Sequence, residues 1–481
     1  MNSGRSGARC GLMATAWLVG GFQQARLCQN PQTGGRGEGA PRWPRHASVE
    51  DCVPSDARFD WPFMSAASHR PPVNERTLLA VLVAVQFTHI MDFMIMMPLG
   101  SRLMRIFSLT PARFGLLVAS YGIAAGVAGF LGGFVLDRFD RKPALLWLYA
   151  GFGLATLGCA LAPNAHFLLL ARVAAGACGG VAGSVVTAMV GDVFPPARRG
   201  RAMSMVMMAF PIASVLGVPT GLRLANHFGW HAPFVFLAIV SLVILAVAWR
   251  NLPILRPAHP AAHPWRQMRA ILVHPVHQRG FMLSAALIFG GACVIPFLAP
   301  SMVANVGLRE DQLELLYFVG GLCAACSTPL IGRLSDRHDK LHVLGWLSLG
   351  AAMSALIVTN LGHVPVPAAV VAVAFFMVMM SGRFSPGMAL VANAIEPRYR
   401  GGFMSVNASI QQGAMGLANF TAGQMVATDT ATGRLVGFPR TGVVAAGAFA
   451  LTLFLAARLR AIAPHAARPG HVEPEPASAV P

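Results

Sequence analysis

The sequence predicts an all-α membrane protein in which twelve transmembrane helices form two pseudo-symmetric six-helix bundles. Its composition, its apolar runs and an internal repeat all favour this fold class. Of the 481 residues, 55% are hydrophobic and 12% are charged, whereas soluble domains carry roughly 25% charged residues. The mean hydropathy is +0.57. This composition excludes a disordered, collagen-like or disulfide-scaffold chain and indicates a polytopic membrane protein.

The charged residues are skewed toward the basic side. Lys and Arg number 37 against 19 Asp and Glu, which gives a formal net charge of +18. A nucleic-acid site needs basic residues clustered on a solvated face, but here they stand between long apolar runs. We therefore expect a lipid bilayer as partner and no nucleic acid.

Twelve apolar runs are long enough to cross a membrane. A bilayer core about 30 Å thick takes roughly 20 helical residues at 1.5 Å per residue. The expected spans are 77–100, 112–136, 143–162, 166–191, 202–226, 231–252, 281–306, 312–334, 343–362, 366–391, 403–428 and 437–458.

One long link divides these spans into six plus six. Residues 253–280 are rich in Pro, His and Arg and hold no apolar run. We expect them to form a cytoplasmic central loop between an N-terminal bundle at 77–252 and a C-terminal bundle at 281–458.

The two ends of the chain fall outside the spans. Residues 1–76 are rich in Gly, Arg and Pro and contain no run long enough to span a bilayer. We expect either that they form a disordered extension, or that the start codon has been placed too early and translation begins at Met64. Residues 459–481 predict a disordered tail.

The two halves resemble each other in sequence. Gly133–Arg141 aligns with Gly332–Lys340, and Pro196–Ser204 aligns with Pro397–Ser405 at nearly the same separation along the chain. Two independent matches of this kind indicate an internal duplication of six helices.

The arginines predict the orientation. The links after spans 2, 4, 6, 8 and 10 are rich in Arg, whereas those after spans 3, 5 and 9 are nearly free of Lys and Arg. The positive-inside rule then places the even-numbered links and both termini in the cytoplasm, and we expect a bacterial inner membrane. The first external link is an exception, because it holds Arg102, Arg105 and Arg113 and no acid.

The link after span 2 carries the strongest local motif, G-x-x-x-D-R-x-x-R-K from Gly133 to Lys142. Asp137 and Arg138 stand at a helix end, where opposite charges suit a latch that forms in one conformation and breaks in another. The alternative is a solvated turn that only sets topology. The second copy at Asp336–Lys340 favours the latch.

The twelve spans, the central link and this motif resemble the major facilitator superfamily over about residues 77–460. The stretch is similar to motif A of that family, with Asp140 where the family usually has Gly. The resemblance implies that an arginine of the motif pairs with an acid at the end of span 4, where Asp192 stands. The expected gating latch comprises Gly133, Asp137, Arg138, Arg141, Lys142 and Asp192.

Arg172 lies within span 4. An arginine inside an apolar helix costs at least about 3 kcal/mol unless it faces a partner or an aqueous cavity. It resembles the motif B arginine, which that family associates with proton transfer, although Ala175 replaces the usual Gln. The alternative is a side chain that snorkels from near the end of the span.

Span 5 holds Gly217, Pro219 and Gly221. Small residues with a proline allow close packing and a bend, which suits a helix at a moving interface. The pattern is similar to motif C of drug:proton antiporters, with a valine between Gly and Pro as in the arabinose-efflux-permease-like branch. That resemblance implies export rather than uptake.

Asp92 is the acid that lies well inside an apolar span; the others stand in tails, links or span ends. Burial favours the neutral form of a carboxyl group, so Asp92 could load and release a proton as access to it alternates. His89, one helical turn earlier, shares its face and could relay the proton. The alternative is a neutral or salt-paired structural acid.

The second half offers no interior carboxylate. The candidate cavity residues are Tyr121, Arg383, Asn407, Gln411 and Asn419. The amides could line a wet cavity for a neutral polar or sugar-like substrate, or they could form interhelical hydrogen bonds. Tyr121 is equally compatible with simple packing.

No phosphate-binding loop and no nucleophile–base constellation occurs in the sequence, so we expect neither an enzyme nor a cofactor, and no metal site. The prediction is a monomeric secondary transporter for proton-coupled efflux of a small drug-like or sugar-like molecule by alternating access. The alternatives are a proton symporter or facilitator for uptake, and a non-transporting membrane sensor.

Overall fold

The computed structural model describes residues 74–135, 139–253 and 264–463, and these are almost entirely helical. Most of the expected extension and tail, and the motif residues Asp137 and Arg138, lie outside the described residues.

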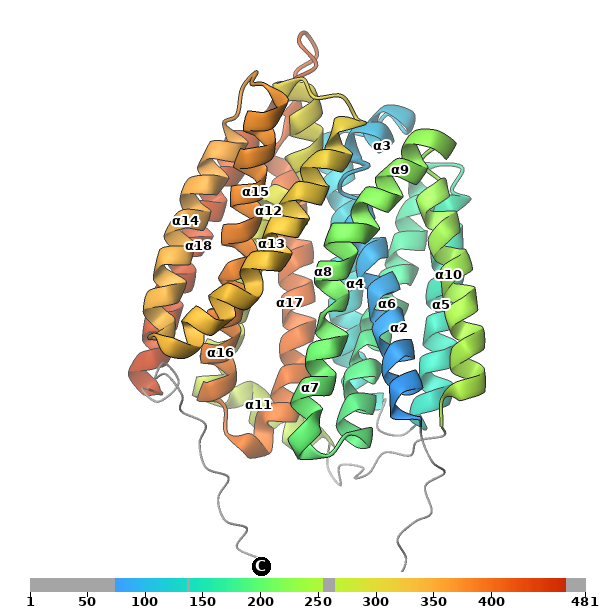
Figure 1. Cartoon of the computed structure of the whole chain (residues 1–481), viewed down its shortest axis with the longest axis vertical. Helices are drawn as coiled ribbons and strands as arrows, with labels where there is room; N and C mark the ends of the chain where they lie inside the picture. Colours follow the sequence, from blue (N-terminus) through green and yellow to red (C-terminus); the bar gives the residue numbers. More distant parts are fainter. Residues whose placement is uncertain (1–73, 136–138, 254–263, 464–481) are drawn as a thin grey trace, which may run out of the picture. The chain divides into compact units, whose positions relative to one another are not determined.

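The N-terminal half runs from α2 to α10 (Figure 1). Its helices are α2 (Glu75–Ile95), α3 (Gly100–Ile106), α4 (Pro111–Val135), α5 (Arg141–Ala160), α6 (Ala165–Val193), α7 (Pro196–Met207), α8 (Ala209–Ile212), the π-helix η3 (Ala213–Gly217), α9 (Val218–Phe228) and α10 (Ala232–Asn251).

The C-terminal half runs from α11 to α18. Its elements are α11 (Pro264–Val273), α12 (Pro275–Ser301), the π-helix η4 (Met302–Val306), α13 (Gln312–Arg337), α14 (Lys340–Thr359), α15 (Val366–Gly382), α16 (Phe384–Ala394), α17 (Pro397–Met425), α18 (Phe438–Ile462), and the two-residue strands β1 (Ala427–Thr428) and β2 (Leu435–Val436). The strands pair in antiparallel register, with Ala427 opposite Val436.

The predicted fold class is confirmed. Within the described ranges, eleven continuous helical segments are long and apolar enough to cross a membrane. The twelfth expected span is α17, whose 29 residues exceed the roughly 20 that a bilayer needs; its amides and glycines make it less apolar. Large apolar side chains such as Trp147, Leu154, Trp249 and Trp346 are exposed, as expected for helices that face lipid.

Several spans are interrupted, and the expected boundaries shift accordingly. Span 1 ends at Ile95 and its last residues enter α3. Span 5 is divided by η3 directly before Pro219, where the missing N–H of proline breaks the helical ladder. Span 10 is divided at Arg383.

The expected central loop also contains more helix than its composition suggested. Residues Pro264–Val273 form α11, and α12 begins at Pro275 instead of at residue 281. Proline is favourable in the first turn of a helix because the N–H it lacks would have no partner there. The proline-rich sequence that looked like a loop therefore contains two helix starts.

The two halves meet along α4 and α17, which lie side by side. Glycines permit this approach: a Cβ added to Gly115 would lie 2.6 Å from the Cα of Gly423, and one added to Gly126 would lie 2.8 Å from the nitrogen of Gly413. These contacts involve backbone atoms, which cannot rotate away as a side chain could.

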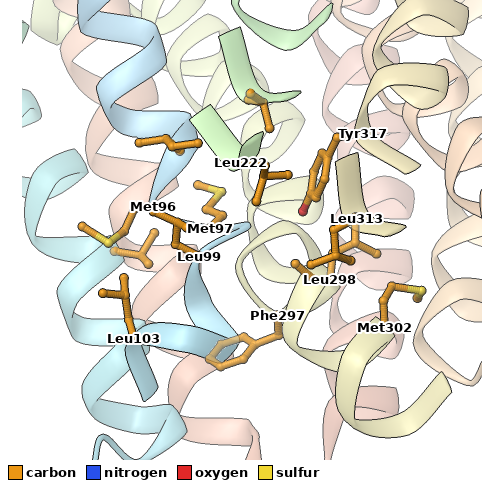
Figure 2. Packing of buried hydrophobic residues seen from close by; sticks show 14 of the residues in the cluster. Met96, Met97, Leu99, Leu103, Leu222, Phe297, Leu298, Met302, Leu313 and Tyr317 are labelled. Atoms are coloured by element: carbon orange, nitrogen blue, oxygen red, sulfur yellow. The ribbon is translucent and has the colours of Figure 1, made fainter. Parts of the chain in front are cut away.

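At one end of the molecule a shared apolar core joins the halves. Figure 2 shows Met96, Met97, Leu99, Leu103 and Leu222 from the N-terminal half near Phe297, Leu298, Met302, Leu313 and Tyr317 from the C-terminal half. All ten side chains are buried. This core closes the end of the molecule that carries α3 and the turn before α13.

We expect Gly126→Ala to destabilise the protein by about 1–3 kcal/mol, the usual cost of overpacking a tight contact, because its methyl group would press on the backbone of α17. The measurement is the thermal unfolding midpoint of the purified protein in detergent. Gly345→Ala is the matched control, since a Cβ at Gly345 meets nothing within 4 Å and should leave the midpoint unchanged or slightly raised. Equal midpoints for the two variants would contradict the close α4–α17 contact.

Candidate functional site

Asp92 and Arg172 form an ion pair inside the N-terminal half. Asp92 comes from α2 and Arg172 from α6, and the distance from Arg172 Nη1 to Asp92 Oδ2 is 2.7 Å, with both side chains 0% exposed. Nη1 also donates to the Asp92 carbonyl oxygen at 3.2 Å. Arg172 therefore does not snorkel to the membrane surface. Asp92 is salt-paired with Arg172, and this arrangement suits both a proton carrier and a structural acid.

His89 and Tyr121 complete the cluster. The Tyr121 hydroxyl lies 2.5 Å from His89 Nδ1 and donates to the His89 carbonyl oxygen at 3.3 Å. The guanidinium carbon of Arg172 lies 4.4 Å from the centroid of the Tyr121 ring, close enough for a cation–π contact. Tyr121, expected among the cavity residues, thus belongs with His89, Asp92 and Arg172. We call these four residues the buried charge cluster.

Glycines on α6 make room for this cluster. A Cβ at Gly179 would lie 2.6 Å from His89 Nδ1 and 2.9 Å from the Tyr121 hydroxyl, and one at Gly176 would overlap the Tyr121 backbone. Small residues of this kind let membrane helices approach closely. The role of these two glycines was not predicted, although they stand three residues apart on one face of α6.

Much of the hydrogen-bonding capacity of the ion pair is unused. Asp92 Oδ1 and the Nε and Nη2 atoms of Arg172 have no hydrogen-bond partner among the described residues. Burial favours a neutral carboxyl group at Asp92, whereas the adjacent guanidinium favours the charged form. Asp92 is therefore expected to hold a proton more readily when Arg172 moves away from it, and to release the proton when Arg172 returns.

One ion pair expected for the motif A stretch is formed. Arg141 Nε donates to Asp192 Oδ2 at 3.1 Å, and both side chains are largely buried. Gly133 lies near the end of α4, and Arg141 and Lys142 begin α5. In the second copy of the motif, Asp339 caps α14 by accepting from the backbone N–H of Leu341 and also pairs with Arg460 at 3.0 Å.

A second group of ionic contacts joins the two halves at the end with the shared apolar core. Arg102 Nη2 lies 2.6 Å from Glu310 Oε2, and Arg105 Nη2 lies 2.7 Å from Glu310 Oε1. Asn226 Nδ2 donates to Glu314 Oε1 at 2.9 Å, and Arg223 lies 3.4 Å from the same carboxylate. These six residues, Arg102, Arg105, Arg223, Asn226, Glu310 and Glu314, are called the interbundle charge cluster. This cluster explains why the first external link can hold Arg102 and Arg105 without an acid of its own. Their counter-charge, Glu310, comes from the other half of the chain.

The span 5 motif packs against the helix that carries Asp92. A Cβ on Gly221 would meet Ile95 and Met91, and one on Gly217 would meet Met91. In the adjoining η3, the Ser214 carbonyl lies 3.0 Å from the Cβ position of Gly321 in α13. Span 5 therefore contacts both α2 and the opposite half, as expected for a helix at an interface.

The candidate cavity residues of the C-terminal half do not join the buried charge cluster. Arg383 is fully buried and donates to the Leu287 carbonyl oxygen at 2.5 Å. Gln411 Nε2 contacts Met388 Sδ at 3.3 Å. Asn407 and Asn419 are buried, and Asn419 lies at the α4 seam, where its carbonyl is near Gly115. Tyr121 and Asn419 thus lie apart from Arg383, Asn407 and Gln411, which belong to α15–α17 of the C-terminal half.

Two surface hollows among the described residues are lined by other side chains than these candidates. These hollows, of about 510 Å³ and 610 Å³, are lined mainly by apolar residues of α14 with α15 and of α2 with α7 and α8. The described residues also contain no group of three His, Cys, Asp or Glu side chains that could hold a metal ion.

Comparison with known proteins gives a consistent family match. The family described as Major Facilitator Superfamily matches residues 82–293 and 280–481, close to one segment for each half. The MFS-type transporter YceJ of Bacillus subtilis is 26% identical over 367 residues, which covers 74% of this chain and 90% of that protein.

A probable sugar efflux transporter of Helicobacter pylori is 23% identical over 243 residues, which covers 50% of this chain and 62% of that protein. Among solved structures, a D-xylose–proton symporter superposes with a TM-score of 0.64 at 19% identity, covering 80% of this chain and 96% of that one. At this identity the structural likeness supports the fold alone.

Proposed function

The chain belongs to the major facilitator superfamily, and from this premise we propose that it exports a small organic molecule in exchange for protons. It is a multi-pass membrane protein with the fold of that family's transporters. The proposal concerns the coupling ion, the direction of transport and the residues involved.

The single observation that carries proton coupling is the Asp92–Arg172 ion pair, in which both side chains are fully buried between α2 and α6. In one state Arg172 neutralises the Asp92 carboxylate. When a proton binds Asp92, the attraction between the two side chains weakens and Arg172 is released to other partners. The Tyr121 hydroxyl is hydrogen-bonded to His89, and the Tyr121 ring lies against the Arg172 guanidinium. A change of protonation at Asp92 would thus alter the packing of α2 against α6.

Two sets of ionic contacts at opposite ends supply gates for alternating access. The interbundle charge cluster holds the halves together at one end, and the Arg141–Asp192 pair belongs to the latch at the other. Both sets are formed in this structure, with the Arg141–Asp192 pair inside the N-terminal half. We expect the interbundle charge cluster to break when the halves separate at its end, so that a central site faces first one side of the membrane and then the other.

The orientation and setting follow from the arginine distribution. We place the latch end and both termini in the cytoplasm and the interbundle charge cluster outside, in a bacterial inner membrane, with the protein acting as a monomer. Export agrees with the motif C-like sequence at Gly217–Gly221. Both export and a sugar-like substrate agree with the relative from Helicobacter pylori, a probable sugar efflux transporter.

The test is flux in proteoliposomes that contain the purified full-length chain. With an imposed pH gradient, a transported compound should move against its own gradient, and protons should move in the opposite direction. Collapse of the gradient by a protonophore should stop accumulation. Protons moving in the same direction as the compound would establish a symporter instead, and flux that does not respond to the gradient would establish a facilitator. Absence of flux for every compound screened would favour the sensor.

A further inference from the structure

We propose that the transported molecule carries a carboxylate or phosphate group, which Arg383 binds inside the C-terminal half. This inference deepens the proposed transport function and rests on it. Arg383 stands at the break between α15 and α16, and its side chain is 0% exposed. Its guanidinium carbon lies 4.0 Å from the centroid of the Phe449 ring of α18, and its Nη2 donates to the Leu287 carbonyl oxygen of α12.

The positive charge of Arg383 has no counter-charge. Among the described residues no carboxylate pairs with it, and its Nε and Nη1 atoms lack a hydrogen-bond partner. Arg172 provides the contrast within the same chain, because that buried arginine lies 2.7 Å from Asp92. A buried charge is costly unless it is paired and hydrogen-bonded. The N-terminal half supplies a partner for its arginine, and the C-terminal half does not.

The helices that Arg383 contacts, and α17 beside them, hold further hydrogen-bond donors that lack strong acceptors. Ser284 Oγ and Gln411 Nε2 both point to Met388 Sδ, at 3.9 and 3.3 Å, and Arg383 Nη2 lies 3.6 Å from Met380 Sδ. A thioether sulfur is a weak acceptor. Three polar side chains from α12, α16 and α17 and their flanks therefore hold donors that an oxygen-rich ligand could recruit at little cost.

These residues form one connected group. Ser284 lies one helical turn before Leu287 on α12, Met388 follows Arg383 along α16, and Gln411 of α17 contacts Met388. The helix α12 contacts α16, α17 and α18, and the Gln411–Met388 contact joins α17 to α16. One turn before Gln411, the buried Asn407 Oδ1 has no partner among the described atoms and could accept from a ligand hydroxyl or amine.

An oxyanion matches this donor set. The planar guanidinium binds a carboxylate or phosphate through two parallel N–H···O bonds, and here Nε and Nη1 are the atoms without partners. The Ser284 hydroxyl and the Gln411 amide could donate to further oxygens. A neutral molecule would leave the buried charge of Arg383 unbalanced, so we expect an acid, including a sugar acid or sugar phosphate, in preference to its neutral analogue.

The test measures ligand binding by the shift in thermal unfolding midpoint of the purified full-length protein. The probes are a panel of small carboxylates and phosphates, each with its neutral counterpart, for example gluconate and glucose 6-phosphate against glucose, and benzoate against benzamide. Wild type should be stabilised by at least one acid and not by its neutral counterpart. In Arg383→Gln that affinity should fall at least tenfold, whereas Arg309→Gln, which changes an exposed arginine, should retain it.

A second measurement does not depend on the choice of probe. Without ligand, Arg383→Met should raise the unfolding midpoint, because an apolar side chain of similar length replaces an unpaired buried charge. A lower midpoint for Arg383→Met, or no acid in the panel that binds in an Arg383-dependent way, would overturn the inference. If acids bind but no proton-driven flux is found, the proposed function is overturned and the inference stands. If neutral compounds show proton-driven flux and Arg383→Gln leaves that flux unchanged, the inference is overturned and the proposed function stands.

Discussion

Proteoliposomes containing Asp92→Asn are expected to lose proton-driven transport by at least a hundredfold, while substrate exchange at equal concentrations on both sides continues. Asparagine has the size of aspartate and can still accept a hydrogen bond from Arg172, but it neither binds a proton nor carries charge at neutral pH. The substitution would therefore remove proton binding at this position and preserve the packing of α2 against α6. The measurement compares accumulation under an imposed pH gradient with exchange of labelled substrate in its absence.

The control for Asp92→Asn is Asp429→Asn. Asp429 is an exposed acid between β1 and β2 that accepts hydrogen bonds from Thr432 Oγ1 and the Ala431 N–H, contacts that hold the pKa of its carboxyl group below the usual value. Its replacement should leave flux unchanged. Full proton-driven accumulation by Asp92→Asn would remove Asp92 from the coupling role and leave it as a structural acid. Loss of both accumulation and exchange in a correctly inserted protein would place Asp92 in substrate binding.

The depth of Asp92 was predictable, whereas its surroundings were only partly so. The apolar run around Asp92 and the apolar run around Arg172 each marked a costly charge, and two opposite charges at membrane depth are expected to meet. The contact between Tyr121 and His89 was not predictable, because it depends on the rotation of α4 against α2. A single sequence sets which residues share a face of one helix but not which faces of two helices meet.

The same limit applies to the breaks in the spans. Apolar length predicted spans 5 and 10, yet it did not indicate η3 before Pro219 or the break at Arg383. Both features depend on how backbone polar groups find partners when the regular ladder is interrupted. The break at Arg383 matters for the candidate site, because it places the guanidinium near Leu287 instead of on a continuous helix face.

The arginines of the first external link illustrate the largest gap between sequence and structure. Counted within their own link, Arg102 and Arg105 contradict the positive-inside rule. In the fold they meet Glu310, which is 208 and 205 residues away along the chain. Their charge is balanced by contacts between the two halves, which a count over neighbouring residues could not reveal.

This balance predicts that Glu310→Gln will open the end of the molecule that carries the interbundle charge cluster. Glu310 accepts from Arg102 at 2.6 and 3.0 Å and from Arg105 at 2.7 Å, and its side chain is only 20% exposed. Loss of its charge should weaken the closed state by about 1–2 kcal/mol, a shift of roughly five- to thirtyfold between the two states. The measurement is the rate at which a membrane-impermeant maleimide labels Met302→Cys in an otherwise cysteine-free chain, because Met302 is buried in the shared apolar core.

Arg309→Gln provides the matched control for this effect. Arg309 directly precedes Glu310 in the sequence. Its ion pair with Asp311, at 3.0 Å, is exposed, with side-chain exposures of 74% and 61%. Both partners belong to the C-terminal half, so this ion pair does not join the two halves. Labelling in that variant should equal wild type. If Arg102→Gln and Glu310→Gln act on the same contact, the double variant should label about as fast as the faster single variant, because neighbouring partners are not additive. Additive rates, or labelling unaffected by Glu310→Gln, would mean that the apolar core of Leu298 and Met302 closes this end without help from the charges.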